Sequence, residues 1–126
     1  EPVQKYTSED LDWTDKKSRS TLEKNDPSSR PAIAEHVDHM DQYDTVFVGF
    51  PIWWYEAPRI IHTFLEEYDF TCKTIVPFAT SGGSGMGKTS EILQKVCPAA
   101  NVLAGRKMNA SVSEAQVKKW MEEMGL

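Results

Sequence analysis

A glycine-rich segment holds the residues of this 126-residue chain whose spacing most directly suggests chemistry. Residues 82–89 fit a phosphate-binding pattern, in which a glycine and four further residues precede Gly-Lys-Thr. In such a site backbone N–H groups surround the phosphates, Lys88 would reach the outer ones and the Thr89 hydroxyl would bind magnesium. The same chemistry needs an acidic residue at the end of another strand, and no apolar run of this sequence ends in Asp or Glu. Nucleoside triphosphate hydrolysis is therefore the less favoured interpretation of this loop.

An aromatic cluster upstream of the glycines favours a different ligand. The apolar run 45–50 is followed by Pro-Ile-Trp-Trp-Tyr, and three adjacent aromatic side chains outside a strand expose a large apolar area unless something flat covers them. A planar aromatic cofactor would cover them, with the backbone of residues 80–85 close to its polar edge. In the alternative interpretation, Trp53, Trp54 and Tyr55 are ordinary core or interface residues.

The elements that must position these loops alternate between strands and helices. Residues 45–50 and 74–79 have the apolar, β-branched composition of strands covered on both faces, and 101–104 is predicted as a third, short strand. Pro58 is predicted to begin the first helix and Ser113 to cap the last. The helix faces are formed by Ile60, Ile61, Phe64, Leu65 and Tyr68, by Ile92, Leu93 and Val96, and by Val117, Trp120, Met121 and Met124. This alternation predicts an α/β fold with a parallel sheet.

Two segments of the chain resemble the flavodoxin family. Residues 44–58, with Pro-Ile-Trp-Trp-Tyr-Glu-Ala-Pro, and residues 77–87, with Phe-Ala-Thr-Ser-Gly-Gly-Ser-Gly, look like its third and fourth strand-loop units. Residues 8–13 and 18–21 are similar to the long loop of a bacterial flavodoxin-like branch. The resemblance implies a three-layer fold with strand order 2-1-3-4-5, of which strands 3 to 5 and their helices would be represented here.

The resemblance also implies a cofactor, flavin mononucleotide (FMN), and the residues that would hold its ring. Trp53, Trp54 and Tyr55 would stack on the ring, and Thr80 to Ser84 would face its polar edge. The full set of implied cofactor-binding residues is Pro51, Ile52, Trp53, Trp54, Tyr55, Glu56, Ala57, Thr80, Ser81, Gly82, Gly83, Ser84 and Gly85.

The sequence departs from the family pattern at its amino-terminal side. Nothing before Asp44 matches the Thr/Ser-Gly-Asn-Thr type loop that binds the FMN phosphate at a helix N-terminus, so the resemblance implies a chain without the first two strands and that loop. Residues 1–126 would then be a single truncated domain, with a loop-rich polar segment, 1–43, and a strand-helix core, 44–126. Without the first two strands of the family's sheet, strand 45–50 would lie at an apolar sheet edge, which predicts a homodimer or swapped assembly.

Composition narrows the classes of partner. A formal charge of −5 disfavours a nucleic-acid surface and suits a basic redox partner, and no apolar run approaches the roughly 18 residues that span a bilayer. Cys72 and Cys97 are expected to be reduced, small buried side chains, so a cytoplasmic location is predicted. His36 and His39, with their neighbouring carboxylates, are assigned to a solvated face rather than to a metal site.

The predicted function is that of an FMN-binding electron-transfer protein of the oxidoreductase class, in which the flavin and no named catalytic side chain does the chemistry. Two alternatives remain open. One is a flavodoxin-like module that binds no flavin and acts through self-association. The other is an FMN-dependent reductase of quinones or nitro compounds.

Overall fold

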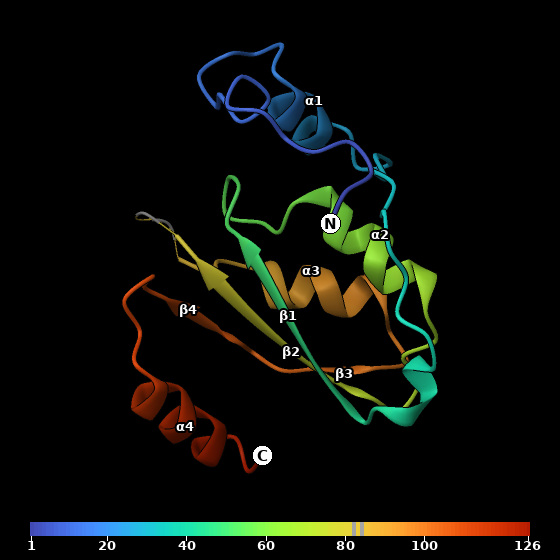
Figure 1. Ribbon diagram of the computed structural model, residues 1–126, viewed down its shortest axis with the longest axis vertical. Coiled ribbons are helices and arrows are strands. Elements are labelled where there is room, and N and C mark those ends of the chain that lie inside the picture. The colour runs from blue at the N-terminus through green and yellow to red at the C-terminus, as the bar shows by residue number, and fades with distance from the viewer. Residues whose placement is uncertain (82, 84) are drawn as a thin grey trace.

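The computed structural model describes residues 1–81, 83 and 85–126 and has three layers around a parallel sheet. Helices α2 (Arg59–Glu67) and α3 (Thr89–Val96) cover one face, and α4 (Glu114–Glu123) lies on the other (Figure 1). This arrangement confirms the predicted α/β class with a parallel sheet.

The sheet places strand β2 (Thr74–Thr80) between β1 (Thr45–Pro51) and the pair β3 (Asn101–Val102) and β4 (Arg106–Met108). This order agrees with that expected for the third, fourth and fifth strands of the family. The strand predicted at 101–104 stops at Val102, and its continuation as β4 was missed because Arg-Lys-Met lacks an apolar run.

Pro77 and Gly105 account for the interruption between β3 and β4. The N–H of Leu103 donates to the Ile75 carbonyl at 2.9 Å, so the ladder is intact up to that point. Pro77, two residues further along β2, has no N–H to donate. Beside it Gly105 has a φ of +74°, and a Cβ there would lie 2.3 Å from the Pro77 carbonyl oxygen. The chain can therefore pass Pro77 closely only with glycine at position 105.

The main core lies between the sheet and helices α2 and α3. Ile75, Ala79 and Leu93 are fully buried, and Val48 and Phe50 of β1 join them at 6% exposure. The predicted apolar face of the first helix contributes Leu65 to this core, with Ile61 and Phe64 partly buried against it. The helix begins at Arg59, one residue after the start predicted at Pro58, which instead occupies the N-cap position.

Strand β1 lies at the sheet edge, and its second face is open. Among the described residues it pairs with β2 only, and Phe47, on the face opposite Val48, remains 40% exposed. Trp120 of α4 reaches the Phe47 ring edge-on, with 6.3 Å between ring centroids. The expectation of a sheet edge is thus confirmed, whereas the expectation of a strand covered on both faces is wrong for β1.

The amino-terminal segment forms a closed loop that docks on α2. A bridge between Pro2 and Ile33 closes it, and inside it α1 (Arg19–Asn25) begins at its cap Ser18. Arg59 of α2 donates to the Lys24 carbonyl at 2.7 Å and to the Glu23 carbonyl at 3.3 Å, at the carboxyl end of α1. A buried cation thereby satisfies helix-end carbonyls and holds α1 above the sheet, as Figure 1 shows.

The start of the last helix agrees with the prediction. Ser113 caps α4 as predicted, in a reciprocal capping box with Gln116.

Cys97 is buried as expected, whereas Cys72 is exposed in a left-handed turn (φ 62°), so its assignment as a buried side chain is wrong. Among the described residues, the helices include none that is long and apolar enough to cross a membrane.

Candidate functional site

The two predicted cofactor loops leave the sheet side by side. Pro51 at the end of β1 is in register with Thr80 at the end of β2, and the Ile52 N–H donates to the Thr80 carbonyl at 3.3 Å. The carboxyl ends of parallel strands are where open α/β sheets bind ligands. The strand register therefore places residues 51–57 and the described part of 80–85 at one such ligand-binding edge.

The aromatic residues after β1 form a tight two-residue turn. Trp53 and Glu56 exchange backbone hydrogen bonds of 2.9 and 3.1 Å, and the central residues Trp54 and Tyr55 have φ values of +48° and +65°. Turns with two positive φ values normally use Asn or Gly, because a Cβ is strained there. Such strain concentrates at functional sites, where the surrounding structure enforces it.

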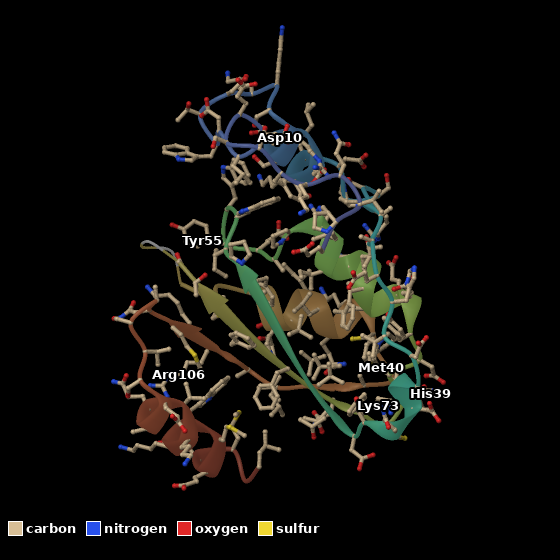
Figure 2. All side chains as sticks on the ribbon, in the orientation of Figure 1. Asp10, His39, Met40, Tyr55, Lys73 and Arg106 are labelled. Atoms are coloured by element: carbon tan, nitrogen blue, oxygen red, sulfur yellow. The ribbon has the colours of Figure 1, made fainter. Side chains whose placement is uncertain are left out.

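The aromatic side chains of this turn have different surroundings. The Trp53 ring meets Tyr6 edge-on, with 5.4 Å between ring centroids, and the Lys24 ammonium lies 5.7 Å from the centre of the Trp54 ring. Tyr55 is 62% exposed and stands at the sheet end between the sheet and the segment that bears Asp10 (Figure 2). Tyr55 is therefore the side chain of the three that is most open to a ligand.

Thr89 and Gly87 fix the backbone of this turn against the start of α3. The Thr89 side chain is 1% exposed, and its hydroxyl contacts the carbonyls of Tyr55, at 3.1 Å, and Met86. Gly87 has a φ of +54°, and a Cβ there would come within 3.2 Å of the Tyr55 carbonyl oxygen. Because the Thr89 hydroxyl is buried in these contacts, it is not placed to bind magnesium. This position does not fit the role that Thr89 would have in a site for a nucleoside triphosphate.

The described glycines of the second loop have free space around them. A Cβ at Gly83 or Gly85 would meet no atom of the described residues within 4 Å. The protein's own packing therefore does not require glycine there, whereas a ligand lying against the backbone would. Gly82 and Ser84, also among the predicted site residues, lie outside the described part of the chain.

The other predicted site residues are held by the protein itself. Ala57 is 5% exposed and belongs to the core. Glu56 lies 4.0 Å from the Arg59 guanidinium. The Ser81 hydroxyl accepts a hydrogen bond from the Gly83 N–H at 3.2 Å. Thr80 differs from these residues, because it is exposed at the strand end.

A hollow beside the aromatic turn contains residues that the sequence did not place in the site. It has a volume of about 400 Å³ and is lined by residues 52–55 of the turn and by Leu11, Trp13 and Ser20 of the amino-terminal segment. We call it the Trp13 pocket. Trp13 is 72% exposed and Leu11 44%, so neither serves a core. Two large apolar residues within an otherwise polar segment were the sequence signal for this pocket.

A polar cluster supports the wall of this pocket. The Arg19 guanidinium lies 3.8 Å above the Tyr6 ring and pairs with Glu23 at 2.8 Å. Burial, together with a hydrogen bond from the phenol to Glu23, raises the pKa of Tyr6 well above its usual value. Tyr6 therefore stays neutral, and its ring is fixed as a support for Trp53.

Comparisons with known proteins agree with this geometry. The chain is similar to the crystal structure of a "putative flavoprotein" from Bacteroides eggerthii DSM 20697, with a TM-score of 0.93 and 46% identity, covering 99% of this chain and 78% of that one. It is also similar to a "putative flavoprotein" from Bacteroides uniformis ATCC 8492, with a TM-score of 0.90 and 48% identity, covering 97% of this chain and 78% of that one. No curated protein matches the chain.

The sequence profile described as "Flavodoxin" matches residues 1–124, which is nearly the whole chain. This match includes the amino-terminal segment with α1 as well as the strand-helix core. The family and its flavoprotein neighbours support a flavin-associated redox role. On the match, the strand order and the paired loops at the sheet edge, this chain belongs to the flavodoxin family.

Proposed function

We propose that this chain binds the ring of FMN between Tyr55 and the glycine loop and acts as an electron-transfer protein of the oxidoreductase class. The observation that carries the proposal is the open space at Gly83 and Gly85, next to an exposed aromatic side chain on a strained turn. The flavin would supply the redox chemistry by exchanging one or two electrons.

The protein's own groups would bind and orient the ring. Tyr55 offers an aromatic face, and an aromatic pair contributes about 0.5–1.5 kcal/mol beyond burial of its area. The exposed backbone at Gly83 and Gly85 offers polar groups to the edge of the ring, apart from the Gly83 N–H, which donates to the Ser81 hydroxyl. Thr89 and Gly87 hold the Tyr55 backbone in place, so little ordering is needed on binding.

Titration of the chain with FMN and with riboflavin, followed by quenching of flavin fluorescence, tests this function. The described site residues address the ring rather than the phosphate, so we expect the two flavins to bind with similar affinity. If neither flavin binds, the proposal fails and the alternative of a module without flavin is supported.

We further propose that β1 pairs with a second copy of this chain. A groove of about 550 Å³ runs along β1 and α2, lined by Phe47, Phe50, Ile60, Ile61 and Phe64 among others. An open strand edge beside apolar side chains favours pairing with another strand. Light scattering at micromolar concentration should show a dimer that Phe47→Lys dissociates and Val112→Lys, on another exposed surface, does not. A monomeric parent chain would contradict this assembly.

The net charge of −5 also favours a basic protein as the electron partner. The rate of electron exchange with such a partner should fall as ionic strength rises, since screening weakens attraction between exposed charges. A rate that is independent of salt would exclude electrostatic docking.

A further inference from the structure

A cavity of about 440 Å³ lies between strand β4 and helix α4 and shares no lining residue with the proposed flavin site. It is lined by residues 106–109 and 111–112, of β4 and the loop after it, and by residues 116, 119 and 123 of α4. We call it the Arg106 pocket, and Figure 2 shows Arg106 between the two elements. Residues 116, 119 and 123 are three and four positions apart, so they lie on one face of the helix.

The strand register decides which side chain of β4 reaches this pocket. Met108 is in register with Thr80, and Lys107 with Ala79, which belongs to the core on the α3 side of the sheet. Alternate residues of a strand share a face, so Arg106 and Met108 point to the opposite side, where α4 lies. Arg106 is therefore the cation that β4 presents to the pocket.

Arg106 differs from the other arginines of the chain in having no partner among the described residues. Arg19 and Arg30 each lie 2.8 Å from a carboxylate oxygen, and Arg59 donates to carbonyls at the end of α1. Around Arg106, no carboxylate oxygen of the described chain lies within 4.0 Å, and the side chain is exposed. Its guanidinium is thus available to an anion from outside.

Lys119 supplies a second positive charge from the α4 side of the pocket. It has no ion pair within the described part of the chain, although Glu123 lies one turn further along the same helix face. Its neighbour Lys118 lies outside the pocket, 3.9 Å from Glu114 and with a side chain that is 73% exposed. The two adjacent lysines therefore have different surroundings, and only Lys119 faces Arg106.

The rest of the lining has room for an organic group. The Gln116 side-chain oxygen accepts the Ser113 N–H at 2.9 Å, which leaves its NH₂ group as a neutral donor. Met108 and Val112 add apolar surface, and methionine adapts to ligands of different shape. A phosphate group has five heavy atoms and takes up about 150 Å³, the volume of five water molecules. The pocket is therefore larger than a phosphate group alone requires.

We infer that the Arg106 pocket binds a small phosphate monoester as a second ligand, with Arg106 and Lys119 on the phosphate group and Met108 and Val112 against the organic part. Two cations match the two negative charges that a phosphate monoester carries above its second pKa of about 6. A planar guanidinium also donates two parallel N–H bonds to phosphate oxygens. A carboxylate carries one charge and would leave one cation without a partner. This site does not depend on the proposed flavin function.

The test is a titration of the flavin-free chain with phenyl phosphate at pH 7.5 and low ionic strength, followed by NMR signals of backbone amides and arginine Nε–H groups. We expect saturable shifts at Arg106 and Lys119, weaker binding of the monoanion phenylacetate and no saturable shift with benzyl alcohol. Lys119→Gln should weaken binding about tenfold, as for loss of one hydrogen bond to a charged group. Lys118→Gln makes the same charge change outside the pocket and should not, whereas Glu123→Gln should strengthen binding by removing the opposing carboxylate.

Arg106→Gln is a second variant at an exposed position, and it should keep the urea midpoint of the parent while losing phenyl phosphate affinity. The inference is overturned by the absence of a saturable shift, by equal effects of Lys118→Gln and Lys119→Gln, or by equal affinity for phenylacetate and phenyl phosphate. If Lys119→Gln weakens binding of FMN but not of riboflavin, the pocket holds the cofactor's own phosphate and no second ligand. Binding of phenyl phosphate without binding of any flavin would retain this site and reject the proposed function.

Discussion

The Thr89 hydroxyl lies 3.1 Å from the carbonyl oxygen of Tyr55 and ties the turn after β1 to the first residue of α3. These residues belong to different strand-loop-helix units. The bond is buried, since Thr89 is 1% exposed. It therefore fixes the distance between the aromatic turn and the glycine loop, which are the two parts of the proposed flavin site.

Replacing Thr89 with valine should lower stability and loosen the site. The substitution keeps the side-chain shape but leaves the Tyr55 carbonyl without its hydroxyl partner, which costs about 1–3 kcal/mol. Urea unfolding measures this loss, and riboflavin titration measures the effect on the site. Thr89→Ser is the control, because it retains the hydroxyl and should keep the riboflavin affinity of the parent. If valine is as stable as threonine, the bond does not hold the turn.

Replacing Gly83 with alanine should separate binding from folding. A Cβ at this position meets no atom of the described residues within 4 Å, so the free energy of unfolding should stay within about 0.5 kcal/mol of the parent value. A ring against the backbone would meet the new methyl group, and a clash of about 1.4 kcal/mol corresponds to a tenfold loss of affinity. Parallel urea and riboflavin titrations give both quantities, and an unchanged riboflavin affinity would place the ring elsewhere.

Gly105→Ala should have the opposite profile, with a large loss of stability and no direct contact with the flavin site. Its φ of +74° costs a residue with a Cβ about 1–2 kcal/mol, and the methyl group would lie 2.3 Å from the Pro77 carbonyl oxygen. Overpacking of this kind adds about 1–3 kcal/mol. Thermal unfolding should therefore show a markedly lower midpoint than for Gly83→Ala. Equal midpoints would mean that β3 and β4 can separate from Pro77 at little cost.

Because the turn is strained, replacing Tyr55 with glycine should stabilise the fold and weaken flavin binding. Tyr55→Gly removes a side chain from a residue with a φ of +65°, which should stabilise the fold by up to about 1 kcal/mol after allowance for glycine's entropy in the unfolded chain. The same change removes the exposed aromatic face and should weaken riboflavin binding. Tyr55→Phe, which keeps the ring and the strain, should change neither property by much. Loss of stability in the glycine variant would show that the turn is not strained.

The sequence predicts the elements of the fold that have a local apolar pattern, and it does not predict those that depend on contacts between distant segments. Apolar spacing located β1, β2 and helices α2, α3 and α4, because α2 and α3 bury apolar side chains in the main core and α4 packs Trp120 against Phe47 on the other face of the sheet. Strand β4 was not predicted, because its pairing depends on the backbone of β2 and not on its own charged side chains. A helix end held by a buried arginine, as Arg59 holds α1, gives no local pattern at all.

The candidate site shows the same division. Its two loops were predictable because parallel strands end at one edge, and Pro51 does lie beside Thr80. The contact of Tyr6 with Trp53 and the approach of Trp13 to the same turn depend on how a segment without regular alternation folds back. Only the three-dimensional structure shows these neighbours, because no periodicity in residues 1–18 encodes them.

His62 should make stability fall on mild acidification. The imidazole is 5% exposed, and its Nε2 atom has no hydrogen-bond partner within the described structure. Burial, with the nearby Arg30 and Arg59 cations, lowers the pKa of His62 to about 4 against the attraction of Glu66. The unfolded chain binds this proton near pH 6.5, so stability is greatest above that pH and is lost as the pH falls from 6.5 towards 4.

The size of this effect follows from the pKa difference between the folded and unfolded chains. Each unit of difference corresponds to about 1.4 kcal/mol, so a loss on the order of 2–3 kcal/mol is expected across the window. Urea unfolding of the parent and of His62→Gln between pH 7.5 and 4.5 isolates the contribution, because the variant lacks the titrating group. His39→Gln, at an exposed position, should retain the slope of the parent. If the His62→Gln slope equals that of the parent, another group causes the acid sensitivity and His62 is protonated in the folded chain.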